Sequence, residues 1–577
     1  MIEDRVRFRS WRSRKLMAAA VLTSGVLVVA GCTSSSDKNV GSSSTSNKVG
    51  GTLVDLLPTL VKGLDTDDVG GTSNNPLPQA YNPLVAFSTT VQPDGLRKVD
   101  FATISPLLAS SWTDDNGTYT FKLRQGVMSC AGNEFTADDV VWTLSRIKSV
   151  TGAATTSLSA LNVANVFDPT ITSKTAPAAQ KQITDEVTKV DKYTVKIKVR
   201  QDNGLLLDAL ASPLVSPIDS VEAKKNATPD DPWAHTWLHT HTAGFGPYCT
   251  SSFTPGSAAT LTANKGYTVK KPYFQQVQMK AVPQSANRLA ALQKGEAQIA
   301  GALTNDEYAS AGKAQNTKVL STYGTLNIAL SMNYNYAPWG PNGAAAATAM
   351  RHAVASAVPY DSIVKDSLGG VGKTMNGLIP DISAGAKTYP GVLTTDVAKA
   401  KQYLAAAGYP DGNNIPPAGL QLFFAAESAT QLQPIAIQIQ SALAAIGVKI
   451  TLNPIPQAQL QTRVYINNDV PMVLQVIGAG IPDSTYYTQL WYVPTKDGGT
   501  TGLGAYNDPK VTALYQQAAV SKGAQRETLI GQAQDILIQD LPMFPVAAIP
   551  LEAAVDKKLT GVQVSSFGPD YALVSES

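Results

Sequence analysis

Three of the four histidines in this 577-residue chain lie within one stretch of seven residues. Imidazole nitrogens are common ligands of divalent metals, and on a helix His235 and His239 would share one face at a spacing that can chelate an ion. A polar surface loop explains the same stretch, because Trp233 and Trp237 flank the histidines and Gly244 follows them. We favour the loop, expect no resident cofactor, and keep as candidate metal ligands His235, His239 and His241.

Serine nucleophiles are the second chemistry to consider. Ser145, Ser310 and Ser362 each precede a lysine by three residues, which is the spacing of the acylating serine in penicillin-binding enzymes. Those enzymes also need S-D-N and K-T-G motifs, and neither occurs; G-x-S-x-G and H-E-x-x-H are missing as well. A phosphate loop fails too, because Ser367 stands where G-x-x-x-x-G-K-[ST] requires its first glycine. We therefore predict that the chain is not an enzyme, with a secreted hydrolase as the remote alternative.

The first of three cysteines marks a processing site. Basic residues dominate the opening of the chain, and the apolar run Leu16–Ala30 follows, which is typical of a secretory signal peptide. The run leads into Val-Ala-Gly-Cys32, which resembles the lipobox of bacterial lipoproteins, where the cysteine thiol receives a diacylglycerol. Residues 1–32 are therefore predicted to be a lipoprotein signal peptide with Cys32 as the lipid attachment site, and the serine-rich residues 33–49 a flexible tether. The alternative is a plain signal peptide.

This reading places the chain outside the cytoplasm, anchored to the cell membrane by a lipidated cysteine. Lipidation of the first cysteine leaves an even pair, Cys130 and Cys249, in an oxidising compartment that permits disulfides. We predict that these two are bonded. The alternative is two separate buried thiols, because spacing along the chain does not show that their Cα atoms come close enough.

Composition limits what the exported part can be. The length implies two or more domains, and 44% apolar with 16% charged residues is ordinary for a globular protein. No stretch reaches the roughly 20 apolar residues of a membrane span, so a polytopic transporter is excluded. The net charge of +2 argues against a nucleic-acid binder, which would carry a concentrated basic face.

The predicted helices and strands that would position a site follow two sequence patterns. An amphipathic helix, a glycine and a short strand are predicted at 288–300 and again at 435–452, where apolar residues recur at helical spacing before Gly447. Residues 119–123 and 193–199 instead alternate like half-solvated strands. These patterns indicate mixed α/β lobes. A further helix is predicted to begin at Ala137, capped by Thr136, with the helix-start carboxylates Asp138 and Asp139 in its first turn.

Five signatures follow one another in an order that is typical of one family. Residues 398–412 contain A-K-x-x-L-x-x-A-G-Y, and residues 244–248 read G-F-G-P-Y. The full set is Leu107–Trp112 with Tyr119–Val127 and Phe135–Arg146, then Gly244–Tyr248, Met350–Ala357, Ala398–Gly412 and Arg526–Pro542. Together they resemble the family 5 solute-binding proteins of ABC importers, which include peptide- and nickel-binding members.

The resemblance implies a two-lobed, periplasmic-binding-protein-like α/β fold with mixed sheets, two hinge strands and a ligand enclosed between the lobes. It implies a monomeric receptor whose partners are a small solute or peptide and the permease and ATPase subunits of an importer, with no nucleic acid. Hinges are expected near Val282–Pro283 and Met543–Pro545. The implied ranges are 50–84, 212–283 and 544–577 for lobe I, 85–211 for a subdomain inserted in lobe I, and 284–543 for lobe II.

The ligand class depends on one loop. Peptide-binding relatives carry G-W-x-x-D-x-x-[DE]-P, whose first acid pairs with the α-ammonium of the ligand. Here Gly480 takes the place of that aspartate and Ile477 that of the tryptophan, whereas Asp483 aligns with the downstream acid. A buried ammonium needs a counter-charge, so two interpretations stay open. Either Asp483 takes the ammonium of a peptide, or the ligand lacks a free amine, as a glycoside, an opine-like compound, a blocked peptide or a larger hydrophobic solute would.

Aromatic residues close to this loop and in a second segment could supply stacking faces, and we expect about half of them to pack the core instead. Glycines in the loop would let a bulky ligand approach the backbone. A nickel or metal-complex ligand is the less favoured alternative. The predicted ligand-binding residues are Tyr334, Tyr336, Trp339, Gly478, Gly480, Asp483, Tyr486 and Trp491.

Overall fold

The computed structural model describes residues 50–66, 76–149, 186–199, 202–340, 344–497, 503–565 and 568–577. The chain divides into Met1–Lys48 and Val49–Ser577, and every described residue belongs to the second unit. The predicted signal peptide, Cys32 and the tether lie outside the described residues. Within the described ranges, no helix is both long enough and apolar enough to cross a bilayer.

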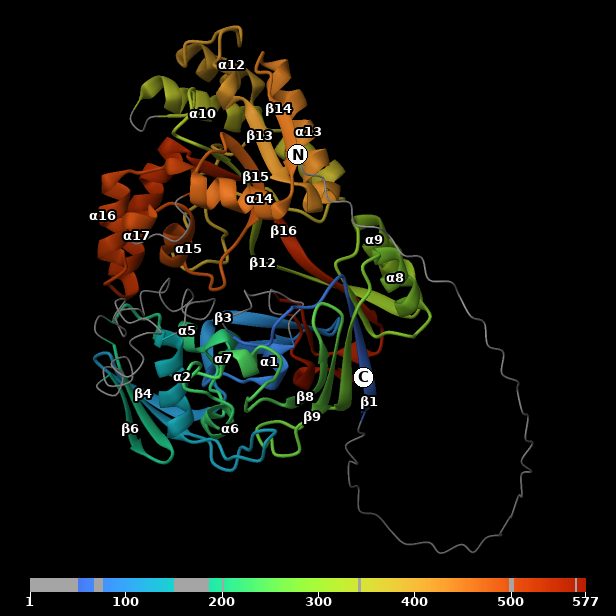
Figure 1. Cartoon of the computed structure of the whole chain (residues 1–577). Helices are drawn as coiled ribbons and strands as arrows, with labels where there is room; N and C mark the ends of the chain where they lie inside the picture. The colour runs from blue at the N-terminus through green and yellow to red at the C-terminus, as the bar shows by residue number, and fades with distance from the viewer. Residues whose placement is uncertain are drawn as a thin grey trace, which may run out of the picture. The chain divides into compact units, whose positions relative to one another are not determined.

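A ten-stranded mixed sheet is the largest sheet of the second unit (Figure 1). It contains both parallel and antiparallel pairs, and its strands come from distant parts of the sequence. In spatial order the strands are β14 (Thr451–Ile455), β13 (Gln421–Ala425), β15 (Met472–Ile477), β12 (Thr317–Met332), β16 (Met543–Asp556), β11 (Ile299–Gly301), β1 (Gly50–Leu57), β10 (Phe274–Ala281), β9 (Ala258–Ala263) and β8 (Tyr248–Thr254).

Two long central strands, β12 and β16, connect the two lobes. They pair antiparallel from Thr317↔Asp556 to Ser331↔Met543, with a register shift after Tyr323. One end of β12 pairs with β15, whereas the opposite end of β16 pairs with β11. Figure 1 shows the pair running between the part that carries β13–β15 and the part that carries β1 and β8. We call these parts lobe II and lobe I, and β12 and β16 the hinge strands.

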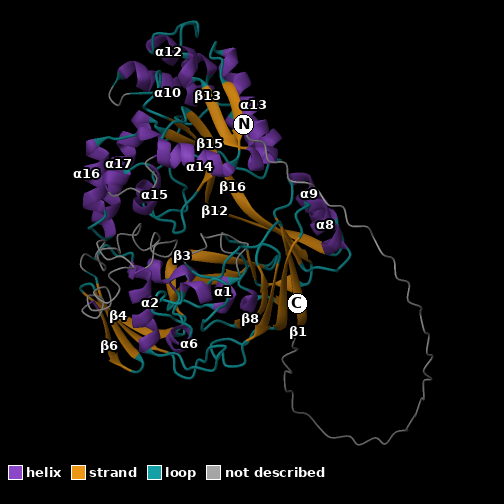
Figure 2. Ribbon diagram, in the orientation of Figure 1, coloured by secondary structure: helices purple, strands orange, loops and turns teal. Residues whose placement is uncertain are grey.

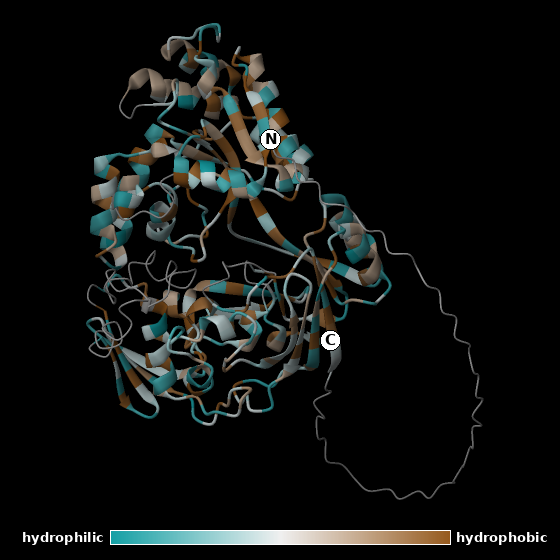
Figure 3. Cartoon of the chain, viewed as in Figure 1, coloured by the Kyte–Doolittle hydropathy of each residue, from teal (hydrophilic) through white to brown (hydrophobic). Residues whose placement is uncertain are grey.

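Lobe II packs helices against β13, β14 and β15. On α13, Ile435, Ile439 and Leu443 are fully buried, which confirms the predicted helical spacing. Gly447 has φ +93° and follows the helix, but β14 begins at Thr451, three residues later than the strand predicted from 448. Figure 3 shows brown strands here and mixed brown and teal helices, as expected for amphipathic covering helices. The helices are α10 (Ala345–Ala357), α11 (Tyr360–Ser362), α12 (Val397–Ala406), α13 (Ala429–Ala445), α14 (Gln457–Gln461), α15 (Ser484–Trp491), α16 (Pro509–Ala518) and α17 (Gly523–Asp540).

Lobe I adds three smaller sheets to its share of the large one (Figure 2). The two predicted alternating strands are confirmed as β5 and β7, which pair antiparallel. The smaller sheets are β18 (Val562–Gln563), β3 (Leu96–Pro106) and β2 (Val85–Val91); β4 (Ala109–Asp115), β5 (Thr118–Leu123), β7 (Thr194–Lys198) and β6 (Val187–Asp191); and β17 (Leu559–Thr560) with β19 (Ser575–Glu576). Its helices include α1 (Leu77–Ala80), α2 (Ala137–Ser149), α5 (Leu206–Leu210), α6 (Ser220–Lys225) and α7 (His235–Leu238).

The first hinge lies later in the chain than predicted. Helix α8 (Ser285–Gln293) and strand β11 form the predicted helix–glycine–strand unit, and α9 (Asn305–Lys313) follows. Strand β11 pairs parallel with β1, so this unit adjoins the lobe I part of the sheet. The crossing is therefore made by β12, from Thr317, and not near Val282–Pro283. Strand β16, the second hinge strand, begins at Met543.

A disulfide joins Cys130, in the turns before α2, to Cys249 of β8, with the Cα atoms 5.7 Å apart. Helix α2 begins at Ala137 as predicted. At its start the side chain of Asp139 accepts hydrogen bonds from the Thr136 backbone N–H at 2.8 Å and from the Ser220 N–H at 2.9 Å. Asp139 therefore performs a structural task at the helix start.

Candidate ligand-binding cleft

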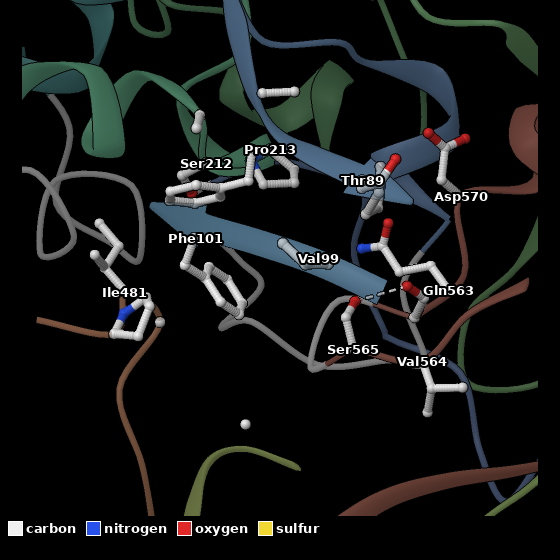
Figure 4. A pocket seen from close by; sticks show the side chains of 18 of the residues that line it. Thr89, Val99, Phe101, Ser212, Pro213, Ile481, Gln563, Val564, Ser565 and Asp570 are labelled. Atoms are coloured by element: carbon white, nitrogen blue, oxygen red, sulfur yellow. Dashed lines mark hydrogen bonds between the residues drawn. The ribbon is translucent and has the colours of Figure 1, made fainter. Parts of the chain in front are cut away.

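A cavity of about 240 Å³ is lined by both lobes and by the hinge strands. Lobe I contributes β2, β3, residues 211–213 and a C-terminal segment that includes 568–570. Lobe II contributes Tyr486 and the loop 479–482 between β15 and α15, and β12 contributes 322–325. Figure 4 shows side chains from these separate segments around one space. Segments that are hundreds of residues apart in the sequence thus share one cleft.

Much of the cavity wall is apolar. Along β3, Arg97, Val99 and Phe101 line it at alternating positions, which a strand places on one face. The Phe101 ring meets Phe87 of β2 edge to face, with centroids 5.1 Å apart. On lobe II, Ile481 lines the same cavity (Figure 4). A ligand with an apolar or aromatic side chain would bury it against this wall.

Charges of both signs also line the cavity. Arg97 donates from Nη1 to the Thr89 hydroxyl at 3.1 Å and from Nε to the Gly561 carbonyl at 3.3 Å, and burial lowers its pKa. Asp570 accepts a hydrogen bond from the Ala572 N–H at 3.0 Å, and burial raises its pKa. Among the lining residues that the structure describes, those with charged side chains are Arg97, Lys98, Asp208 and Asp570.

Asp208 of α5 belongs to a group of three charges where the lobes meet. Arg526 of α17 donates from Nη2 to Asp483 Oδ2 at 2.6 Å and from Nη1 to the Asn203 carbonyl at 2.8 Å. Burial, together with repulsion from Asp483, raises the pKa of Asp208 to about 6, and Arg526 acts in the opposite direction. Arg526 therefore forms an ion pair with Asp483, and it acts on Asp208 only through the electrostatic field.

A family match agrees with this architecture. Residues 103–499, more than half of the chain, match the family described as bacterial extracellular solute-binding proteins, family 5. The chain belongs to this family. Its members are solute-binding proteins, and they include proteins named as periplasmic.

Individual relatives cover most of the chain. The probable D,D-dipeptide-binding periplasmic protein DdpA of Escherichia coli (strain K12) is 26% identical over 500 residues, which are 84% of this chain and 89% of the relative. The structure of DppA from Helicobacter pylori in complex with peptide STSA has a TM-score of 0.72 at 21% identity, covering 93% of this chain and all of that one (100%). AgaA in complex with agropinic acid, from A. tumefaciens R10, has a TM-score of 0.70 at 22% identity, covering 91% and 99%. These likenesses show the two-lobed periplasmic-binding-protein fold.

The structure brings two of the predicted ligand-binding residues to the cavity of this family 5 protein. Gly480 and Tyr486 line it. A Cβ atom on Gly480 would meet nothing within 4 Å, so the loop is open at this position. Gly478 lies two residues earlier and does not line the cavity; a Cβ there would approach the Leu326 side chain to 2.6 Å, and the Gly478 carbonyl accepts a hydrogen bond from Trp491 Nε1 at 3.0 Å. Packing within lobe II therefore explains the glycine at 478.

Asp483 has a structural role that the sequence did not reveal. It caps α15, accepting hydrogen bonds at Oδ1 from the Thr485 and Tyr486 N–H groups at 2.9 and 3.0 Å. Its other oxygen pairs with Arg526. Asp483 is 4% exposed and is not among the residues that line the cavity. The geometry thus differs from the one in which Asp483 receives a ligand ammonium, because helix capping and the ion pair occupy both carboxylate oxygens.

The second predicted aromatic group lies inside lobe II. Trp339 is fully buried and donates from Nε1 to the Gly419 carbonyl at 2.8 Å. The Tyr336 hydroxyl donates to the Asp469 carbonyl at 3.0 Å, and the ring of Tyr334 stacks beneath the guanidinium of Arg351 at 4.4 Å. None of these three aromatic residues lines the cavity. They belong to the lobe II core or pack against it, as does Trp491, so that Tyr486 alone of the five aromatic candidates lines the cavity, fewer than the half expected.

The three histidines lie around α7, away from the cavity lining. His235 Nδ1 is 2.8 Å from the Oδ2 atom of the buried Asp65, which also pairs with Arg146. The ring of His241 stacks on Trp237, with centroids 4.7 Å apart. Among the described residues, no group of three or more histidine, cysteine or acidic side chains could hold a metal ion.

Sequence reasoning missed the lobe I side of the cleft. The alternation of Arg97, Val99 and Phe101 resembles that of any half-exposed strand, so it does not single out a site. Asp208 did carry a signal, because it is a lone charge within the apolar run Leu205–Leu210. An acid in such a run is either paired or functional, since burial of an unpaired carboxylate is unfavourable.

Proposed function

We propose that this protein is the solute receptor of an ABC importer, which captures a peptide or peptide-like compound between its lobes and delivers it to a membrane permease. The observation that carries the proposal is the cavity itself, which both lobes line and which combines an apolar wall with charges of both signs. A zwitterionic ligand with apolar side chains has the complementary chemistry. Binding would hold the lobes together through both walls, as in other hinge-closing receptors.

A peptide ligand has support from a relative. DdpA is named as a probable D,D-dipeptide-binding protein, and its similarity covers most of this chain. The second candidate is a ligand without a free amine, such as an opine-like compound, because Gly480 stands where peptide-binding relatives carry the ammonium-binding acid. AgaA, which has the same fold, is described in complex with agropinic acid.

The first experiment is native mass spectrometry of the protein purified in mild detergent, followed by denaturing release of whatever is bound. A ladder of masses that resolves into peptides is expected. A single non-peptide mass would favour the amine-free class instead. An empty protein whose thermal unfolding does not change with a peptide panel or with opine-like compounds would contradict both ligand classes.

We also propose that the protein is anchored by a lipid on Cys32. The signal-peptide pattern and the lipobox-like sequence before Cys32 support this location. Metabolic labelling with palmitate is expected to label the wild-type protein and not a Cys32→Ser variant. Equal labelling of both proteins would contradict the anchor, and it would leave the receptor role unaffected.

A further inference from the structure

Two carboxylates line the cavity: Asp570 lies near the two cations Lys270 and Arg97, whereas the cation near Asp208, Arg526, is already paired with Asp483. Asp208 lines the cavity from α5, where its neighbours Leu206, Ala209 and Leu210 are buried. Within the described part of the chain, the Asp208 carboxylate accepts a hydrogen bond only from its own backbone N–H. Its oxygens therefore keep hydrogen-bonding capacity for a ligand in the cavity.

The charges around Asp208 leave a local excess of negative charge. Asp483, which caps α15, and Arg526 of α17 face it from lobe II, and these two already form an ion pair at 2.6 Å. The second donor nitrogen of Arg526 bonds the Asn203 carbonyl. The other charged groups lining the cavity are Arg97, Lys98 and Asp570. Strand β2 and residues 213–215, which also contact α5, carry no charged side chain.

The two candidate acids thus differ in what they can bind. Both oxygens of Asp483 have partners within the protein, whereas Asp208 faces the cavity across the lobe boundary from the loop that contains Gly480. A cation beside Asp208 would restore neutrality in a poorly hydrated place, where a charge-assisted hydrogen bond is strong.

We propose that Asp208 is the residue that receives the cationic end of the ligand, a primary ammonium group, in place of the acid that Gly480 lacks. The inference rests on the proposed receptor function and narrows its ligand to amine-bearing solutes. It also places the acid that binds the ligand's ammonium group in lobe I, and not in the lobe II loop. Protonation of Asp208 would remove this recognition, so the preference for amines should weaken as the pH falls below about 6, the pKa of Asp208 in the unliganded cleft.

The test compares probes that differ only in the amine. Isothermal titration calorimetry would measure binding of the dipeptides Ala-Phe and Leu-Phe, their N-acetyl forms, and 2-phenylethylamine against 2-phenylethanol. We expect the wild-type protein to favour the amine of each pair, and Asp208→Asn to reduce amine affinity about 10- to 100-fold with little effect on the neutral probes. Asp208→Glu should keep part of the preference. Asp100→Asn, a matched change at an exposed position of β3 outside the cavity lining, should keep all of it.

The outcomes separate this inference from the receptor function. Peptide binding with an amine preference that survives Asp208→Asn would overturn the role of Asp208 and leave the receptor function intact. Equal binding of dipeptides and their N-acetyl forms by the wild-type protein would overturn the cation site alone. Binding of no amine probe would overturn both the peptide class and the cation site. If Asp208→Asn does not fold, the preference of the wild-type protein for the amine probes is measured at about pH 5 and at pH 7.5. An amine preference that does not change with pH would overturn the inference.

Discussion

Three aspartates show how the surroundings of a carboxyl group determine its role. Burial raises the pKa of Asp483, Asp208 and Asp55 alike. Asp483 is compensated by helix capping and by Arg526, so it is a structural acid. Asp208 lacks such compensation and faces the cleft. Asp55 lies in the lobe I core, where one oxygen accepts from the Tyr571 hydroxyl at 2.5 Å and the other has no partner among the described residues.

Asp55 makes the stability of the protein depend on pH. Burial raises its pKa from 3.8 to about 7, and the hydrogen bond from Tyr571 acts in the opposite direction. Because the pKa is higher in the folded than in the unfolded chain, the folded state binds the extra proton. The free energy of unfolding therefore falls as the pH rises from about 4 to about 7, by at most roughly 1.4 kcal/mol per pH unit from this group.

We expect Asp55→Asn to flatten this decline, because an amide does not titrate. Urea unfolding at about pH 5 and pH 8 would measure the difference between variant and wild type. The matched control is Asp115→Asn, at an exposed position of β4, which should keep the wild-type dependence. An Asp55→Asn protein with the wild-type pH profile would contradict the protonation of Asp55 in the folded state.

At the scale of elements, glycines end the helices of lobe II and allow close contacts between loops. Gly408 follows α12 with φ +89°, and Gly447 follows α13 with φ +93°. A Cβ on Gly408 would meet nothing within 4 Å, whereas a Cβ on Gly447 would lie 2.5 Å from the Asp411 carbonyl oxygen. The loops after the two helices therefore touch at Gly412 and Gly447. A side chain at either position would overlap the backbone of the opposite loop unless that loop moved.

Alanine variants of these two glycines distinguish the free-energy cost of a positive φ from the cost of steric overlap. Gly408→Ala should lower the free energy of unfolding by about 1 kcal/mol, because alanine disfavours a positive φ. Gly447→Ala should lower it by a further 1–3 kcal/mol or so, since it adds the overlap with the backbone of residue 411. Urea unfolding of the two variants at one pH measures both quantities. Equal destabilisation would show that the loops can move apart freely.

At the scale of the whole second unit, the lobes meet at several places besides the hinge strands. Ile481 and Tyr486 pack in the apolar cluster of lobe I, and residues 202–203 form polar contacts with α17 and the turn before it. There Lys522 pairs with Asp202 at 2.6 Å, and Asn203 Nδ2 donates to the Ala519 carbonyl at 3.3 Å. Arg526 is central to these polar contacts, because it bonds the lobe I backbone and the lobe II carboxylate of Asp483 together.

Removal of Arg526 should therefore be more damaging than removal of Lys522. Arg526→Ala leaves the Asp483 carboxylate buried without its cation, and we expect a loss of about 3 kcal/mol or more in the free energy of unfolding. Lys522→Ala breaks a pair whose lysine side chain is 53% exposed, so a loss within about 1 kcal/mol is expected. Urea unfolding measures both. A loss for Arg526→Ala no larger than that for Lys522→Ala would show that Asp483 does not depend on this ion pair.

The same contact bears on ligand capture. Because Arg526 joins the lobes beside Asp208, its loss should also change how tightly the cleft holds a ligand. The cavity walls come from both lobes, so weaker contact between the lobes reduces the burial of any bound solute.

Local features of this protein could be predicted from its sequence. Helix α13 with Gly447, helix α8 with Gly295, the strands β5 and β7, and the start of α2 at Ala137 all appear where periodicity and turn residues indicated them. These features depend on residues that are neighbours along the chain, so a short window of sequence contains the relevant interactions. The ordered signatures of the family indicated the two-lobed fold by the same local means.

The tertiary structure alone decided how the elements combine into a site. The sequence of a helix–glycine–strand unit does not show which lobe the unit belongs to. Only the pairing of β11 with β1 places residues 285–301 beside lobe I. The acid of the lobe II loop was identified, but Arg526, which pairs with it, lies 43 residues away. The cavity draws on segments from Pro78 to Asp570. Burial, ion pairing and cavity shape are set by residues far apart in sequence. For that reason the sequence marks Asp208 as an unusual acid in an apolar run, but only the folded chain places it at the cavity.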